Sequence, residues 1–418
     1  MISEILFNNY RLFKGENELS FIADGRTKKL LSNSISLDDK NILKAVAIYG
    51  PNNSGKSHIF HLMELLKCIL LGIGSCEFNR EIFADEPLST FAITYNNNDK
   101  KGWIRYEFAF DSRTKRFVKE RLVAITYYPA GTPFEKTVFE KDDENKVFKV
   151  LGEDRSEILS FIPSKLPILY SIELSNGKLA PLSEWLLSLQ ALGNSIELLR
   201  MYDIPINKTI AALKSSDAKR KKFITAFVKD ADLSIDDFGY QKDVHLIQNG
   251  ETIDESVLAN YELDALHLTT TYGNKEVPSL FVDSSGTKKM EALASYVYEA
   301  ITEGKTLVVD ELDNGLHFRL TRAIVSTFNN LANEKGQLLF TAHDLMLIDC
   351  RMLLRKDQIY FLERSDGTTT LYCLKNATAA TGGPREGTDI LKRYNKGHYG
   401  KLPSPNFIDD LLDLLDKG

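Results

Sequence analysis

The chain has 418 residues, which is enough for roughly two to three domains of ordinary size. Hydrophobic residues make up 43% and charged residues 26%, a balance that excludes a disordered chain, a collagen-like repeat and a coiled-coil rod. The formal net charge is −6, from 52 Lys and Arg against 58 Asp and Glu. Bulk charge therefore argues against a protein that coats nucleic acid, while a local basic patch stays open.

The cysteines and the N-terminal residues indicate a cellular location. The N-terminal residues lack the basic start and apolar core of a signal peptide, and no apolar run reaches the ~18–20 residues of a membrane span. The cysteines have neither zinc-ligand spacing nor a disulfide framework: Cys68, Cys76, Cys350 and Cys373. We expect a cytoplasmic protein with reduced thiols and no membrane partner.

The first half of the chain combines hairpin, strand and helix patterns. Residues 2–19 alternate as an opening strand or hairpin does, and the polar residues 24–41 indicate a surface loop. The apolar run 42–49 is typical of a buried parallel strand, and residues 58–71 have helical spacing. From 91 to 126 the period becomes two, as in antiparallel strands, with one apolar face formed by Ile104, Tyr106, Phe108 and Phe110.

The second half returns to strands alternating with helices. Residues 183–229 are predicted to be rich in helix, with one apolar face that contains Trp185, Leu186, Leu189, Leu192, Ile196 and Leu199. A β-like stretch covers 244–282. Helices are then predicted at 291–301 and 319–333, and buried strands at 306–309 and 337–341. This alternation predicts a parallel α/β sheet.

A phosphate-binding motif follows the first buried strand. Residues 50–57, GPNNSGKS, match G-x-x-x-x-G-K-[ST] at every fixed position, with a strand before the motif and a helix after it. The backbone N–H groups of this loop are expected to face the β-phosphate, Lys56 to reach the β- and γ-phosphates, and Ser57 to bind Mg²⁺. The loop residues expected to bind the nucleotide are Gly50, Asn52, Asn53, Ser54, Gly55, Lys56 and Ser57.

Two carboxylates complete the expected ATP site. Asp310 and Glu311 end the strand 306–309, at the edge where α/β sheets place ligands. Asp310 is expected to hold Mg²⁺ and Glu311 to polarise the attacking water, although such a pair alone is also typical of a solvated strand end. Gly55 and Asp310 are 255 positions apart, so the intervening chain must include an insertion into a split ATPase.

Three further features favour an ABC-type ATPase. The segment 283–287, DSSGT, precedes a helix and resembles the signature that caps the γ-phosphate of a partner's ATP through Ser284, Ser285 and Gly286. An ordinary helix N-cap is the alternative interpretation of these residues. The turn 313–317 follows the carboxylates, and His343 ends the next strand, where such enzymes place a γ-phosphate sensor.

Together these motifs resemble the ABC-type ATPases of the overcoming-lysogenisation-defect (OLD) class and their AAA-family relatives in bacterial phage-defence operons. The opening FNNYR at 7–11 and the tail YNKGHYG at 394–400 add to the resemblance. ATPases of the PARIS antiphage system and those associated with RloB-type proteins are both similar, and the choice between them stays open.

The resemblance implies an α/β fold: an ABC-type P-loop NTPase head with a mixed or parallel sheet, flanking helices, an antiparallel β-lobe and an inserted helical arm. The expected units are 1–150, the first part of the head; 151–243, the helical insertion; and 244–418, the rest of the head. It implies two protomers around two ATP molecules with Mg²⁺, catalytic roles for Lys56, Glu311 and His343, and slow hydrolysis because a serine replaces a signature glycine.

The resemblance further implies a separate effector, a Toprim or HNH nuclease or a toxin, released or licensed when a phage protein acts as trigger. A RecF/SMC-like DNA-repair ATPase is the alternative. The basic run 219–222, KRKK, favours DNA contact, although such a run is also typical of a solvated helix face. The net charge and the lack of long heptads oppose DNA contact. Nucleic-acid binding therefore stays open, and a transporter subunit is a remote third interpretation.

Overall fold

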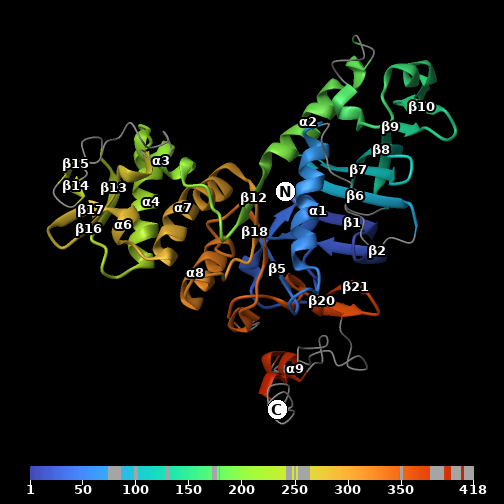
Figure 1. Ribbon diagram of the computed structural model, residues 1–418. Helices are drawn as coiled ribbons and strands as arrows, with labels where there is room; N and C mark the ends of the chain where they lie inside the picture. The colour runs from blue at the N-terminus through green and yellow to red at the C-terminus, as the bar shows by residue number, and fades with distance from the viewer. Residues whose placement is uncertain are drawn as a thin grey trace, which may run out of the picture.

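One large mixed sheet organises the molecule. The computed structural model describes residues 1–73, 86–97, 102–127, 132–171, 177, 179–241, 247–248, 251–252, 264–348, 352–376, 390–396 and 406–408. Within these residues, 14 strands form one sheet in the order β11-β10-β9-β8-β7-β6-β1-β2-β21-β20-β5-β19-β18-β12. Figure 1 shows its antiparallel lobe on one side of the parallel strands and a helical arm on the other.

The antiparallel lobe confirms the expected period of two. Its strands are β1 (Ile2–Tyr10), β2 (Phe13–Ser20), β6 (Leu88–Asn97), β7 (Gly102–Asp111), β8 (Arg116–Thr126), β9 (Phe134–Asp142), β10 (Val147–Val150) and β11 (Glu153–Asp154). The side chains of Ile104, Tyr106 and Phe108 are at most 3% exposed, and they pack in one core with the helices α1 (Lys56–Leu70) and α2 (Ser183–Ser195). The alternation therefore places an apolar face inside and a polar face outside.

The parallel half of the sheet carries helices on both faces. The parallel neighbours are β5 (Ala45–Tyr49), β19 (Gln337–Thr341), β18 (Thr306–Asp310) and β12 (Ile196–Arg200), with β20 (Ile359–Ser365) parallel to β5 and β21 (Thr368–Cys373) antiparallel to β20. The helices α7 (Ser285–Glu303) and α8 (Phe318–Phe328) pack on the face opposite α1 and α2. The expected α/β fold with a mixed sheet and flanking helices is confirmed.

Two predicted elements are divided differently in the structure. The run 42–49 is split, because β4 (Lys40–Leu43) pairs with β3 (Ser34–Leu37) in a hairpin and β5 begins only at Ala45. The Lys44 ammonium between them donates to the Asn330 carbonyl at 2.7 Å. The hairpin begins within 24–41 and ends at Leu43, so that range is not merely a surface loop.

Two predicted helices end earlier than expected. Ile196 and Leu199 belong to β12 rather than to the apolar face of α2, because residues 196–200 pair with residues 306–310 of β18. The helix predicted at 319–333 ends at Phe328, where the Asn333 amide donates to the Phe328 and Gly336 carbonyls. A side chain that bonds the local backbone competes with continued helix.

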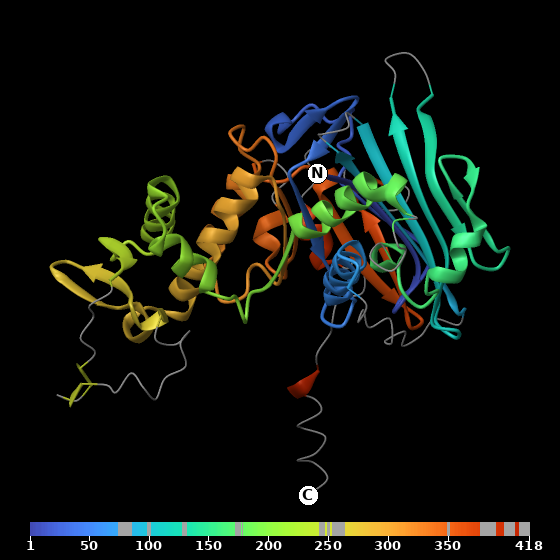
Figure 2. The ribbon, with the colours of Figure 1, turned by 90° about the horizontal axis from the view of Figure 1, so that it is seen from above.

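A separate layer of helices and strands forms the projecting arm (Figures 1 and 2). It contains α3 (Asn207–Lys214), α4 (Ala218–Ala231), β13 (Asp237–Tyr240), β14 (Ile247–Gln248), β15 (Glu251–Thr252), β16 (Leu268–Tyr272), β17 (Lys275–Pro278) and α6 (Ser279–Val282). A small core joins α3 and α4 to α7. The range 151–243, expected as the insertion, also includes β11 and β12 of the large sheet, and the β-like stretch 244–282 supplies arm strands where it is described.

Several remaining expectations concern the ends and the thiols. Cys68 and Cys373 are free thiols, whereas Cys76 and Cys350 lie outside the described residues. The helix α9 (Ile390–Asn395) packs Tyr394 against Phe361 with ring centroids 5.6 Å apart, and residues 397–400 of the tail motif lie outside the described residues. No helix in the described part of the chain has the length and apolar character that a membrane crossing requires.

Candidate nucleotide-binding site

The phosphate loop connects β5 to α1 at the carboxyl edge of the parallel strands. Gly55 has a φ of +107°, a conformation that favours glycine, and a Cβ on Gly50 would lie 2.5 Å from the Ser54 hydroxyl. A residue outside the loop also stabilises it: the hydroxyl of Thr369, on β21, donates to the Ser54 carbonyl at 2.9 Å. Ser54 is 1% exposed and its own hydroxyl oxygen has no partner among the described residues. The loop is therefore a tight turn with an unused polar atom inside it.

Lys56 lies inside this turn. Its ammonium donates to the carbonyls of Gly50 at 2.6 Å and Pro51 at 3.0 Å, and the residue is 6% exposed. Burial lowers the pKa of Lys56 to about 8, although the nearby carboxylates of Glu311, Asp310 and Asp313 partly oppose that shift. The expected phosphate-binding lysine thus lies within the electrostatic influence of the expected Mg²⁺ and water carboxylates.

The two carboxylates after β18 share a hydroxyl from β19. The Thr341 hydroxyl donates to Oδ1 of Asp310 at 2.7 Å and accepts from the Glu311 backbone N–H at 2.7 Å. Glu311 itself has a φ of +57°, unusual for a residue with a side chain. Strained backbone of this kind clusters at functional sites.

The Glu311 carboxylate lies between a turn residue and the expected sensor histidine. The Asn314 amide donates to Oε2 of Glu311 at 2.8 Å, and Nε2 of His343 lies 3.8 Å from Oε1. Oδ2 of Asp313 accepts from the backbone N–H groups of His343 at 2.8 Å and Asp344 at 2.5 Å. The structure therefore brings Glu311 and His343 together through the turn 313–317.

The signature-like segment begins α7. The Ser284 hydroxyl caps the helix by accepting from the Thr287 N–H at 3.1 Å, as the ordinary N-cap interpretation requires. A Cβ on Gly286 would lie 3.0 Å from the Gly315 carbonyl oxygen, so the segment packs against the turn that follows Glu311. Within the described residues, no hydrogen bond or ion pair joins Ser284, Ser285 or Gly286 to the phosphate loop of the same chain.

A buried acid pair anchors this segment to the arm. Asp283 is 5% exposed and accepts hydrogen bonds at 2.6 Å from the hydroxyls of Thr270 and Tyr272. Burial, with a contribution from Asp283, raises the pKa of Glu291 to about 9. The start of α7 is thereby fixed to strand β16 of the arm.

One comparison with known families decides where the chain belongs. Residues 45–349 match the family model described as "AAA domain, putative AbiEii toxin, Type IV TA system". The match covers more than half of the chain and extends from β5, before the phosphate loop, to beyond His343. The chain belongs to this AAA-domain family. No curated protein matches the sequence.

Solved structures resemble the chain at low identity. The SMC head domain from Thermotoga maritima is 12% identical, with a TM-score of 0.43 over 89% of this chain and 98% of that one. An SMC head bound to the C-terminal winged-helix domain of ScpA is 12% identical, with a TM-score of 0.48 over 90% and 99%. The recombination mediator RecF is 13% identical, with a TM-score of 0.36 over 89% and 98%.

Three residues that hydrogen-bond to the phosphate loop or to the turn after Glu311 are not among the site residues predicted from the sequence. Arg364, near the end of β20, donates to the Asn53 carbonyl at 3.1 Å, and Thr369 of β21 donates to Ser54. Lys289 of α7 donates to the Asn314 carbonyl at 2.8 Å and to its side-chain oxygen at 3.0 Å. Arg364 and Thr369 belong to no local motif, so the sequence does not point to them. Lys289 could have been suggested by its position, because it lies in the first turns of the helix that follows DSSGT.

The donor set fits Mg²⁺. Ser57 is exposed and its hydroxyl has no partner among the described residues, while Oδ2 of Asp310 likewise accepts no hydrogen bond there. One hydroxyl and one carboxylate, with phosphate oxygens and water, are the ligands that Mg²⁺ prefers in nucleotide sites. Among the described residues, no group of three or more His, Cys, Asp and Glu forms a metal cage.

The basic run 219–222 lies on α4, away from this site. Nη2 of Arg220 lies 2.5 Å from Oε1 of Glu299, so one of the four cations joins α4 to α7. Lys219 and Lys222 are exposed. This arrangement leaves a weaker exposed patch than the sequence alone indicates.

Proposed function

We propose that the chain is an ABC-type ATPase that binds and hydrolyses ATP with Mg²⁺, forms a dimer or higher oligomer around ATP, and controls a separate effector in antiviral defence. One observation carries the ATPase part: Lys56, Asp310, Glu311 and Asp313 converge at one edge of the sheet although Lys56 and Asp310 are far apart in sequence. The family of the chain agrees with nucleotide chemistry.

In this proposal each residue at the carboxyl edge of the parallel strands has a separate role in ATP binding or hydrolysis. Backbone N–H groups of residues 50–57 bind the phosphates, and the Lys56 ammonium exchanges its carbonyl partners for phosphate oxygens. Ser57 and Asp310 hold Mg²⁺, which when bound neutralises charge on the β- and γ-phosphates. Glu311, oriented by Asn314, accepts a proton from the attacking water. His343 lies beside Glu311 to contact the γ-phosphate.

The proposed dimer follows from the start of α7. Within the described residues, the N–H groups of Ser285 and Gly286 donate to no acceptor, and a helix N-terminus favours a phosphate group. Because no hydrogen bond or ion pair joins this segment to its own phosphate loop within the described residues, we assign it to the ATP of a second protomer. The serine in place of a glycine agrees with slow turnover.

The effector part rests on context. The description of the family names a toxin of a type IV toxin–antitoxin system, and the sequence resembles ATPases of phage-defence operons. We therefore propose a Toprim or HNH nuclease, or a toxin, as the controlled partner and a phage protein as the trigger, in the cytoplasm. The RecF/SMC-like alternative rests on the basic run 219–222, of which Arg220 is paired with Glu299 while Lys219 and Lys222 are exposed.

The experiment is a comparison of Glu311→Gln with the wild type. The variant should bind ATP with unchanged affinity and hydrolyse it about 100-fold more slowly or worse, because the water loses its proton acceptor. Glu334→Gln, an exposed change away from the edge, is the matched control. Hydrolysis at the wild-type rate by Glu311→Gln would remove Glu311 from the proposed role.

The partner is tested with the same variant. Glu311→Gln, expressed with its native neighbouring genes, should co-purify a stoichiometric nuclease or toxin identified by mass spectrometry. Recovery of the ATPase alone, or with DNA, would contradict the effector part and leave the ATPase part standing.

A further inference from the structure

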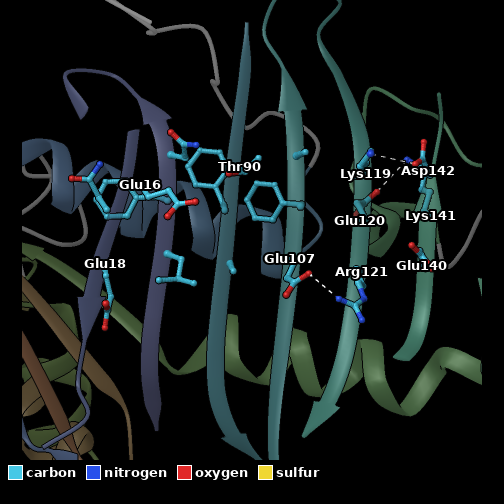
Figure 3. Close-up of a pocket in the computed structure, with 18 residues that line it drawn as sticks. Glu16, Glu18, Thr90, Glu107, Lys119, Glu120, Arg121, Glu140, Lys141 and Asp142 are labelled. Atoms are coloured by element: carbon cyan, nitrogen blue, oxygen red, sulfur yellow. Dashed lines mark hydrogen bonds and ion pairs between the residues drawn. The ribbon is translucent and has the colours of Figure 1, made fainter. Parts of the chain in front are cut away.

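A concave groove of about 610 Å³ crosses the outer face of the antiparallel lobe (Figure 3). Three consecutive residues from each of β2, β1, β6, β7, β8 and β9 line it. The middle residue of each triplet, for example Phe7, Phe91 or Lys141, is buried, at most 6% exposed. Because side chains alternate along a strand, the residues on either side of it point into the groove.

The strand register aligns these side chains in two rows across the sheet. One row runs from β2 to β9 through Glu18, Leu6, Ala92, Glu107, Arg121 and Glu140. The other runs in the same direction through Glu16, Asn8, Thr90, Ala109, Lys119 and Asp142. The small side chains of Thr90, Ala92 and Ala109 therefore lie in the middle of the groove beside the Glu107–Arg121 ion pair, and further carboxylates lie at both ends.

The groove carries excess negative charge. Six carboxylates and three cations line it, and each cation has a nearby carboxylate: Lys141 with Glu120 at 3.2 Å on the buried side, Arg121 with Glu107 at 3.6 Å, and Lys119 with Asp142 at 3.4 Å. Glu16 and Glu18 at one end, and Glu140 at the other, have no ion-pair partner among the described residues. All three are exposed.

The dimensions of the groove fit a polypeptide. Six neighbouring strands about 4.8 Å apart span about 24 Å, and the two rows lie about 7 Å apart along the strands. A helix of about 16 residues has this length. Leu6, 38% exposed, and the small side chains of Ala92 and Ala109 offer apolar contact between the acidic ends.

We propose that this groove is the docking site for a segment of a partner protein that carries Lys or Arg at both ends and small apolar residues between them. Charge complementarity selects this occupant, because three unpaired carboxylates attract cations and repel phosphate backbones. The proposal does not rest on the ATPase function, since no lining residue belongs to the nucleotide edge.

The test uses a defined probe and the full chain without nucleotide, so its outcome is separate from that of the ATPase proposal. The probe is a fluorescein-labelled 16-residue helical peptide with two lysines at each end and alanine and leucine between them. Fluorescence anisotropy should show saturable binding, weakened at least about tenfold by the double change Glu18→Lys and Glu140→Lys. The control pair Glu144→Lys and Glu157→Lys, exposed acids of the same lobe outside the groove, should keep the affinity within about twofold.

Three results would overturn the proposal: no binding of the lysine peptide, equal binding of a peptide with Glu in place of each Lys, or equal loss in the control pair. A 20-base-pair DNA duplex is the second probe. If the duplex binds while the peptide does not, and the changes Glu18→Gln and Glu140→Gln do not alter the affinity for DNA, the proposal is contradicted. If the change of Glu18 and Glu140 to lysine lowers the thermal unfolding temperature, the double change to glutamine replaces it in the peptide experiment. Reduced peptide binding by the folded glutamine pair supports the groove.

Discussion

The two edges of the parallel strands differ in how well their polar and charged side chains are paired. At the amino edge, Glu299 of α7 accepts from Lys208 at 2.7 Å, Lys305 at 2.7 Å and Arg220 at 2.5 Å. Among the described residues, buried side-chain atoms of Ser54, His58 and Asp313 have no partner at the carboxyl edge, against Nε of Arg220 at the amino edge. Buried polar groups are normally satisfied, so a cluster of unsatisfied ones points to a ligand. One edge stabilises the fold, and the other is prepared to bind.

The pKa shifts of Glu299 and Lys56 show the same contrast between the two edges. At the amino edge, burial acts to raise the pKa of Glu299, but hydrogen bonds from Lys208 and Lys305 outweigh it and lower that pKa to about 2. At the carboxyl edge, burial outweighs the nearby carboxylates and lowers the pKa of Lys56 to about 8. The fold thus favours the charged form of Glu299 and disfavours that of Lys56.

The largest effect on stability is expected at the amino edge. Glu299→Ala leaves three cations without their shared carboxylate and should lower the free energy of unfolding by about 3 kcal/mol, measured by urea denaturation at pH 7. Glu303→Ala is the control, because Glu303 is half-exposed and lies 3.3 Å from Lys305 alone; its cost should stay below about 0.5 kcal/mol. Equal costs for the two changes would contradict a stabilising amino edge.

The next effect is a pH dependence of ATP binding. A lowered lysine pKa means that the folded chain loses the Lys56 charge as pH rises through about 8. Since phosphate binding favours the charged form, ATP affinity should be constant from pH 7 to 7.5 and fall by up to about tenfold per pH unit above 8. Calorimetric titrations across this range measure it. Constant affinity up to pH 9.5 would indicate a lysine near its ordinary value of 10.5.

The smallest effect tests how the signature segment is joined to the carboxyl edge. Lys289→Met removes the two hydrogen bonds to Asn314, which in turn orients Glu311. Turnover should fall about threefold to tenfold with ATP affinity unchanged, because Glu311 is less well oriented. Lys288→Met is the neighbouring control. A loss of affinity equal to the loss of turnover would show that Lys289 acts on nucleotide binding instead.

Contiguous motifs made the nucleotide edge predictable, since residues 50–57 and 306–311 carry their strand and ligand signals locally. The strand β12 was not predicted, because short apolar runs fit helix and strand equally and its partner is β18, over 100 positions away. Arg364 and Thr369 reach the phosphate loop only through the pairing of β20 with β5 and β21. The acidic groove likewise depends on the register of six strands, which no local pattern determines.

Isothermal titration of ATP into the wild type and Lys56→Ala tests most directly whether the carboxyl edge binds nucleotide. Removing the buried ammonium eliminates the one lysine inside the phosphate loop, so affinity should fall about 100-fold or more while the thermal unfolding of both proteins stays cooperative. Undiminished ATP affinity in the folded Lys56→Ala protein would contradict the account.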